Sequence, residues 1–170
     1  MSTKTRTTQT PTTGRTLTTV ADTARRLAGD RSLWSHLVDF DPISRYYARI
    51  VAEEGYEAWL LTWLPGQGTD WHDHGESAGS FVVLQGELTE RLASAAGADG
   101  ARRADAAVAQ HRPGEQRTFG RGYVHQVSNH GPDPAVSLHV YAPRLTVMTT
   151  YDLSGRTLRP NLLQEKGIDW

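Results

Sequence analysis

The stretch Trp71-His72-Asp73-His74-Gly75 decides how the fold of this chain is interpreted. Side chains alternate between the two faces of an extended strand, so His72 and His74 point the same way and Asp73 points away. Two imidazoles on one face can chelate a metal ion. The spacing alone is weak evidence, because seven histidines in 170 residues can fall this way by chance. The flanking sequence must therefore supply the rest of a site.

Length and composition limit the alternatives. A chain of 170 residues predicts one domain with a real core. The formal net charge of −1 provides no basic field, so we expect no nucleic acid and no membrane as partners. No apolar run approaches spanning length, and the first residues lack the apolar segment of a secretory signal, so the expected location is cytoplasmic. There is no cysteine, so any metal must be held by histidine or carboxylate.

The order of elements predicts a mainly β fold. Residues 1–18 are rich in threonine and predict a disordered tail, and residues 19–170 predict a single domain. Apolar residues at helical spacing predict two short helices within 19–28 and 33–38. Short strands are expected at 45–51, 56–64, 80–84, 87–92, 116–119, 125–128, 136–141, 146–151 and 156–159, with an exposed loop at 93–106. Many short strands with Gly and Pro turns favour a β-sandwich or a small barrel.

Two glycine-punctuated segments carry a resemblance to a known superfamily. The segments are 66–86, which contains His72 and His74, and 114–129, which contains His125. They resemble the two sequence motifs of the cupin superfamily, which implies a double-stranded β-helix, or small jelly-roll barrel, with the short helices in front. Gly79 stands where the first motif carries a glutamate ligand, and Gly120 stands where the second carries a proline.

The missing glutamate has a chemical consequence. Three neutral imidazoles leave a divalent metal with its full charge and about three open positions. Such a site suits a substrate that brings an anionic donor such as a thiolate, together with dioxygen. Glu76 is the nearest carboxylate, but it is out of register with the motif, so we interpret it as a surface or supporting residue.

A second group of polar residues lies on a later strand. Ser137, His139 and Tyr141 alternate with Leu138 and Val140, which places the three polar side chains on one face. This pattern favours a hydrogen-bond relay that ends in a phenol. The alternative is a buried polar network with a structural role only.

Tyr47 and Arg49 share a face in the same way. An inward arginine in a barrel needs an anionic partner, which a substrate carboxylate could provide in bidentate geometry. The alternative is an arginine on the outer face of the strand. If Arg49 binds the carboxylate, Arg49→Ala raises the KM for the substrate.

Together these residues resemble the cysteine dioxygenase type I family over about residues 40–160. The resemblance rests on Tyr47-Ala48-Arg49, Trp63, His72-Asp73-His74, His125 and Ser137-Leu138-His139-Val140-Tyr141. It implies Fe(II) as cofactor with His72, His74 and His125 as ligands, Arg49 on the substrate carboxylate, and Ser137, His139 and Tyr141 as the catalytic relay, with Trp63 packed behind it. Tyr47 is placed with Arg49 and Trp63 among the substrate-binding residues. Animal members crosslink a cysteine to the relay tyrosine; Gly79 stands at that position here, as in bacterial members.

The function implied is conversion of L-cysteine and O2 to cysteine sulfinic acid by a monomeric enzyme of cysteine metabolism. A related alternative is a dioxygenase of 3-mercaptopropionate or another small thiol, a group that usually carries glutamine in place of the arginine. Two further alternatives are a non-catalytic metal-binding cupin and a cupin isomerase or decarboxylase that uses another divalent metal. His111 and His130 lie in turn-rich sequence, and we expect both on the surface.

Overall fold

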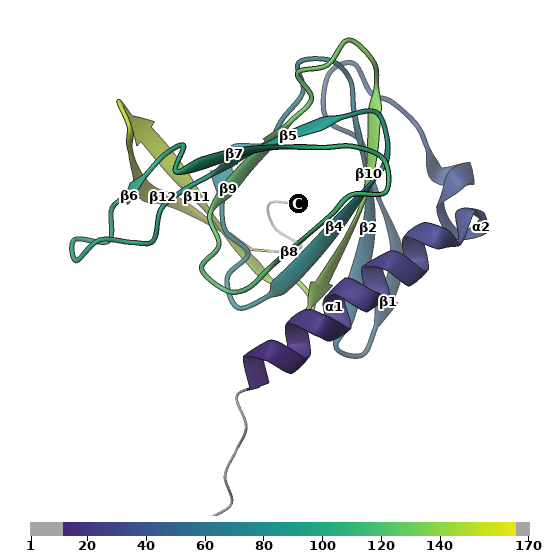
Figure 1. Cartoon of the computed structure of the whole chain (residues 1–170), viewed down its shortest axis with the longest axis horizontal. Helices are drawn as coiled ribbons and strands as arrows, with labels where there is room; N and C mark the ends of the chain where they lie inside the picture. The colour runs from purple at the N-terminus through teal and green to yellow at the C-terminus, as the bar shows by residue number, and fades with distance from the viewer. Residues whose placement is uncertain (1–11, 166–170) are drawn as a thin grey trace, which may run out of the picture.

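Two antiparallel sheets curl around a common interior in the computed structural model, which describes residues 12–165 (Figure 1). The first sheet has five strands in the order β1 (Tyr47–Glu53), β2 (Tyr56–Trp63), β10 (Ala135–Ala142), β4 (Ala78–Gln85) and β8 (Gln116–Phe119). The second has seven strands in the order β6 (Arg102–Arg103), β12 (Thr157–Glu165), β11 (Val147–Ser154), β3 (Trp71–His72), β9 (His125–Ser128), β5 (Leu88–Leu92) and β7 (Ala107–His111). The mainly β prediction is confirmed.

Helices cover the outer face of the five-stranded sheet. They are α1 (Thr12–Gly29), α2 (Arg31–Trp34) and the 3₁₀ turn η1 (Ser35–Leu37). In Figure 1, α1 runs obliquely across this sheet, where it contacts β4, β8 and β10. Its buried residues Val20, Ala24 and Leu27 follow the i, i+4, i+7 spacing of one helix face. Among the described residues, no helix has the length and apolar character needed to cross a bilayer.

The first helix is longer than the sequence pattern predicts. It begins at Thr12, so it overlaps the tail predicted at residues 1–18, and the rest of that tail lies outside the described residues. The predicted loop at 93–106 contains the short strand β6 and the buried residue Ala104, which is 1% exposed. Both segments have little local hydrophobic periodicity, so the sequence pattern marks neither the start of this helix nor the short strand.

Strand β10 is buried on both faces and separates two cores. Leu138 and Val140 pack with the helices on the outer side. Tyr141 packs between the sheets with Trp63 and Phe81. The predicted alternation along this strand is therefore present, and it points the polar residues of β10 into the barrel.

Candidate metal centre and substrate cavity

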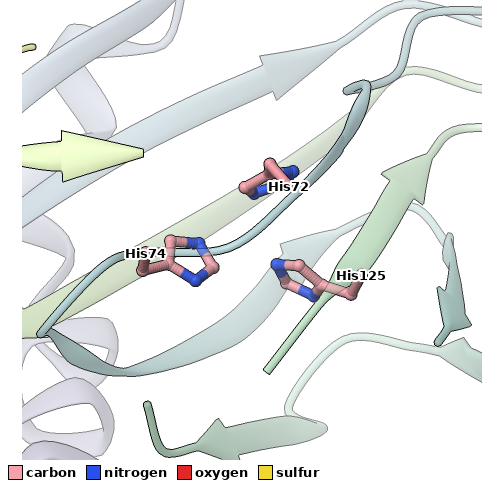
Figure 2. A group of neighbouring side chains, drawn as sticks. All are labelled: His72, His74 and His125. Atoms are coloured by element: carbon pink, nitrogen blue, oxygen red, sulfur yellow. The ribbon is translucent and has the colours of Figure 1, made fainter. Parts of the chain in front are cut away.

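The three predicted metal ligands lie together inside the barrel. His72 on β3 is paired directly with His125 on β9, and His74 follows two residues after His72. Their ring centroids are 4.7 to 5.1 Å apart, and one ring nitrogen from each lies within 4.8 Å of the others. All three rings converge on one point in Figure 2. Each residue is at most 8% exposed, so the group is screened from bulk water.

Neighbouring groups leave a ring nitrogen of each histidine available to a metal. Nδ1 of His72 lies 2.9 Å from the carbonyl oxygen of Asp70, which can only accept, so this nitrogen donates and Nε2 keeps its lone pair. Nδ1 of His125 lies 2.7 Å from a carboxylate oxygen of Glu90, with the same consequence. Neither ring nitrogen of His74 has a hydrogen-bond partner within residues 12–165, although both are buried. A buried polar atom without a partner is costly, so a bound ion would relieve this arrangement.

Burial keeps two of the three ligands, His72 and His74, neutral. Desolvation, with a smaller contribution from His125, lowers the pKa of His72 to about 3. Desolvation also lowers the pKa of His74 well below its usual value, and the neighbouring imidazoles add to the effect. A neutral imidazole is the form that binds metal ions. The residues present therefore fit a divalent transition-metal ion held by three imidazole nitrogens.

The relay predicted on β10 forms a continuous chain of hydrogen bonds. Nε1 of Trp63 donates to Oγ of Ser137 at 2.9 Å. Oγ of Ser137 lies 2.8 Å from Nε2 of His139, and Nδ1 of His139 lies 3.4 Å from the hydroxyl of Tyr141. Burial lowers the pKa of His139 well below its usual value and raises the pKa of Tyr141. At neutral pH this relay therefore contains a neutral imidazole, that of His139, and a protonated phenol, that of Tyr141.

The donor at the start of this relay is compatible with a single direction of donation along it. The indole of Trp63 can only donate, so the Ser137 oxygen accepts there and its own proton is free for Nε2 of His139. When Ser137 donates to Nε2, the single proton of neutral His139 is on Nδ1, where it faces the Tyr141 oxygen. The Tyr141 proton has no acceptor in this sequence of bonds, so the hydroxyl can donate to a molecule in the cavity.

A cavity of about 250 Å³ joins the metal cluster to the relay. Its walls include Arg45, Trp63, His72, His125, His139 and Tyr141. His74 does not line it but packs beside it, between the rings of Phe119 and Tyr141. The cavity thus combines two of the metal-ligand candidates, the phenol and a cation.

The cation in this cavity is Arg45 and not the predicted Arg49. Arg49 is exposed on β1, where its guanidinium carbon lies 5.6 Å from the Trp59 ring centroid. The guanidinium carbon of Arg45 lies 4.7 Å from the Trp63 ring centroid. In an extended chain Arg45 and Arg49 would point to the same face, but they are four residues apart, or about 13 Å along the chain. Arg49 is not among the residues that line this cavity.

Arg45 is incompletely bonded for a largely buried cation. One terminal nitrogen makes a long 3.4 Å hydrogen bond to the Gly68 carbonyl, and Nε has no hydrogen-bond partner in the described part of the chain. Desolvation lowers its pKa, although the group stays protonated at neutral pH. An arginine in this state favours an anionic ligand with bidentate geometry.

Tyr47 lies at the edge of the site. It is 46% exposed and its ring makes an edge contact with Trp59, with centroids 5.9 Å apart. It lines a second cavity of about 90 Å³, which shares Arg45 and Tyr141 with the larger one. The structure thus brings Tyr47 near the predicted site without placing it beside the metal cluster.

Gly79 explains why the glutamate of the cupin motif has no counterpart here. Gly79 is paired with Tyr141 across β4 and β10. A Cβ at this position would collide with the ring of Phe119 and lie 3.1 Å from the Tyr141 ring. Glu76, the nearby carboxylate, is exposed and pairs with Arg121 at 2.6 Å, so it is a surface residue.

Sequence inspection missed a buried carboxylate beside the metal ligands. Glu90 is fully buried and is bonded by His125 and His111 at 2.7 and 2.9 Å. Burial alone would raise its pKa, but the bonds from His111 and His125 and the charge of Arg117 hold the pKa at about 2. The surface prediction for His111 is wrong, because this residue is only 8% exposed; His130 is exposed as predicted.

Comparison with known sequences gives a consistent result. A family model described as "Cysteine dioxygenase type I" matches residues 17–154. The protein named "Cysteine dioxygenase type 1" from Danio rerio is 30% identical over 126 residues, which are 70% of this chain and 61% of that protein. The chain thus spans about three-fifths of the length of this curated relative.

Solved structures agree on the fold. A protein of Thermus thermophilus is similar with a TM-score of 0.55 and 26% identity, over 65% of this chain and 93% of that one. A protein of Klebsiella pneumoniae with a double-stranded β-helix domain is similar with a TM-score of 0.53 and 19% identity, over 64% of this chain and 85% of that one. A cupin superfamily protein of Desulfitobacterium hafniense is similar with a TM-score of 0.52 and 11% identity, over 65% of this chain and 87% of that one. The prediction of a cupin-type barrel is confirmed.

Proposed function

The chain belongs to the cysteine dioxygenase type I family, and from this premise we propose that it is a non-haem Fe(II) dioxygenase converting L-cysteine to cysteine sulfinic acid. Both atoms of one O2 molecule are added to sulfur. Sulfur loses four electrons and dioxygen gains four, so the reaction needs no further reductant. The observation that carries the proposal is the single cavity that brings together neutral imidazoles, an arginine and a protonated phenol.

His72, His74 and His125 would hold the ion. When bound, Fe(II) supplies a site for the thiolate and the one-electron chemistry that lets ground-state dioxygen react with it. The chain contributes neutral donors, because burial keeps His72 and His74 unprotonated. It also contributes enclosure, since the buried ligands exclude most of the bulk water from the reacting thiolate.

Arg45 takes the role first assigned to Arg49. Its Nε, which has no partner among residues 12–165, and the terminal nitrogen with only a 3.4 Å hydrogen bond are available to the substrate carboxylate. The Trp63 ring under the guanidinium holds the plane of the fork in place. A carboxylate bound here fixes one end of a small amino acid, so that its thiol can reach the imidazole cluster in the same cavity.

Tyr141 acts as the hydrogen-bond donor of the site. The chain from Trp63 through Ser137 and His139 leaves its proton available to the cavity. Its raised pKa keeps the hydroxyl protonated at working pH. A donor fixed in this way stabilises negative charge that develops on the oxygen atoms during transfer to sulfur.

Oxygen uptake tests the proposal. Iron-loaded protein is mixed with L-cysteine and, separately, with 3-mercaptopropionate, and the product is identified by mass. We expect faster uptake with L-cysteine, with cysteine sulfinic acid as product. Faster uptake with 3-mercaptopropionate would make that thiol the proposed substrate in place of L-cysteine. No oxygen uptake by protein that holds Fe(II) would favour a non-catalytic metal-binding cupin. The monomeric state and cytoplasmic location remain predictions.

A further inference from the structure

Glu90 is a fully buried carboxylate that the proposed reaction does not use directly. It lies on β5 between Leu88 and Leu92, on the strand face that points into the barrel. Strand β5 pairs with both β9 and β7, so residues of these two strands flank Glu90 diagonally. An isolated charge in such a position would be very costly, so its partners define its role.

Four donors saturate the carboxylate. Oε1 accepts from Nδ1 of His125 at 2.7 Å and from the Tyr123 hydroxyl at 3.0 Å. Oε2 accepts from Nε2 of His111 at 2.9 Å and from Nε of Arg117 at 3.1 Å. Arg117 also donates to the Tyr123 oxygen at 2.8 Å, which ties the donors to one another. Arg117 lies on β8 and His111 on β7, so both sheets hold the carboxylate.

We propose that Glu90 is the positioning residue for His125, fixing its Nδ1-protonated tautomer and placing a negative charge behind the metal-binding ring. A carboxylate can only accept, so the shared proton lies on Nδ1 and the lone pair of Nε2 is directed toward His72 and His74. The inference rests on the proposed metal site and identifies the residue that tunes it.

The charge matters because this site lacks an anionic ligand. The cupin motif position that carries glutamate is Gly79, where Phe119 and Tyr141 leave no room for a side chain. Glu90 restores a carboxylate one imidazole away from the ion. An anionic acceptor on the far nitrogen makes the ring a stronger donor and tightens its orientation. Of the three ligand candidates only His125 has such a partner, since His72 bonds to a backbone carbonyl and His74 has no partner among residues 12–165.

Metal affinity tests this role without relying on turnover. Apoprotein is titrated with Co(II) under anaerobic conditions, and the dissociation constant and the visible absorption of bound Co(II) are recorded for the parent and for Glu90→Gln. We expect a dissociation constant about 10- to 100-fold higher for the variant, the range typical of losing an outer-shell partner. We also expect shifted Co(II) bands, because the donor strength of His125 changes.

Glu57→Gln is the matched control. Glu57 is also 0% exposed, but its carboxylate accepts from the backbone nitrogen of Leu145 at 3.0 Å and lies on β2, in the other sheet. We expect a loss of thermal stability comparable with that of Glu90→Gln, with the Co(II) dissociation constant within about twofold of the parent. Equal Co(II) affinity and spectra for Glu90→Gln and the parent would overturn the proposal and leave Glu90 as a structural charge. A parent protein that binds no Co(II) would overturn the metal site itself.

The unmodified protein provides a second test, which holds even if Glu90→Gln does not fold. Long-range ¹H–¹⁵N spectra of the Zn(II)-loaded protein report which nitrogen of each histidine is protonated. We expect His125 to be protonated at Nδ1, with this proton slow to exchange, and to bind Zn(II) through Nε2. Binding through Nδ1, or rapid exchange of that proton, would contradict the role given to Glu90.

Discussion

Arg45 stacks on the indole of Trp63, with the guanidinium carbon 4.7 Å from the ring centroid, while the same indole donates to Ser137 at 2.9 Å. One tryptophan therefore supports both the proposed carboxylate site and the start of the relay. Because Trp63 is fully buried, neither neighbour can move far without disturbing the other. Through Trp63, the position of the proposed carboxylate-binding arginine is therefore coupled to the hydrogen bonds that orient the Tyr141 hydroxyl.

Arg45, which precedes β1, and Arg49, which lies on it, give the sharpest test of substrate binding. We expect Arg45→Ala to raise the KM for L-cysteine about 10- to 100-fold, because a hydrogen bond to a charged group contributes about 1.5–3 kcal/mol. Arg49→Ala is the matched control, since Arg49 lies exposed over Trp59, outside the larger cavity. Steady-state kinetics of both variants measure the difference. A KM effect in Arg49→Ala with none in Arg45→Ala would restore the original assignment.

The relay makes a prediction about non-additive effects. Tyr141→Phe removes the donor, and we expect kcat to fall about 100-fold, in line with the loss of one donor to developing charge. Ser137→Ala frees Nε2 of His139 and lets the imidazole exchange its tautomer, so that Tyr141 donates to His139 instead of to the cavity. We expect roughly a 10-fold fall in kcat, with the KM for L-cysteine little changed.

The double variant Ser137→Ala/Tyr141→Phe should be no slower than Tyr141→Phe alone, because both changes remove the same hydrogen bond. Thr62→Val is the control. It removes a hydroxyl that is also buried and bonds to the Asp39 carbonyl at 2.6 Å, outside the relay. Independent, multiplicative losses in the double variant would mean that Ser137 does not act through Tyr141.

Loss of bound metal should distinguish the histidines of the metal cluster from the other histidines of the protein. We expect His74→Ala to lose bound iron almost completely, since two imidazoles remain and the ion loses a buried donor. His130→Ala, at an exposed histidine, should retain the parent amount of iron. Metal analysis after anaerobic loading and desalting provides the readout. A His74→Ala protein with one tightly bound iron would remove His74 from the ligand set.

The buried histidines also predict how stability depends on pH. Burial lowers the pKa values of His72, His74 and His139, so between about pH 3 and pH 6.5 the unfolded chain binds protons that the folded chain does not. Unfolding takes up protons in this range, and the stability of the metal-free protein must rise with pH. Each group contributes at most about 1.4 kcal/mol per pH unit.

Thermal unfolding of the metal-free protein between about pH 5 and pH 7.5 measures this slope. We expect the melting temperature to fall as the pH is lowered, and His139→Gln, which cannot titrate, to have a shallower slope than the parent. A melting temperature independent of pH would mean that these imidazoles titrate in the folded chain as they do in the unfolded chain, which would contradict the lowered pKa values.

Local patterns predicted most of the fold and the metal cluster. Strand alternation correctly put Ser137, His139 and Tyr141 on the inner face, and the spacing of His72 and His74 put both rings in one cluster. Alternation fixes the face of a residue but not its distance along the strand from a site. Alternation assigns Arg45 and Arg49 to the same face, and only the tertiary structure distinguishes them, because Arg45 lines the larger cavity and Arg49 does not.

The positions of Glu90 and His111 could not be predicted from the sequence, because they depend on contacts between distant strands. The pairing of β5 with β7 and β9 brings them beside His125, and no local pattern encodes that arrangement. One signal was present: Glu90 stands between Leu88 and Leu92 at a spacing of two, on the apolar face of a predicted strand. A carboxylate at such a position is a candidate for a buried network.

The most direct test of the central claim is turnover of L-cysteine by the iron-loaded protein under isotopically labelled dioxygen, with mass analysis of the product. The proposed reaction requires cysteine sulfinic acid that carries two labelled oxygen atoms from the same O2 molecule. A product with label in only one position, or cystine with no labelled oxygen, would contradict a thiol dioxygenase and reduce this site to a metal-binding cupin with incidental redox activity.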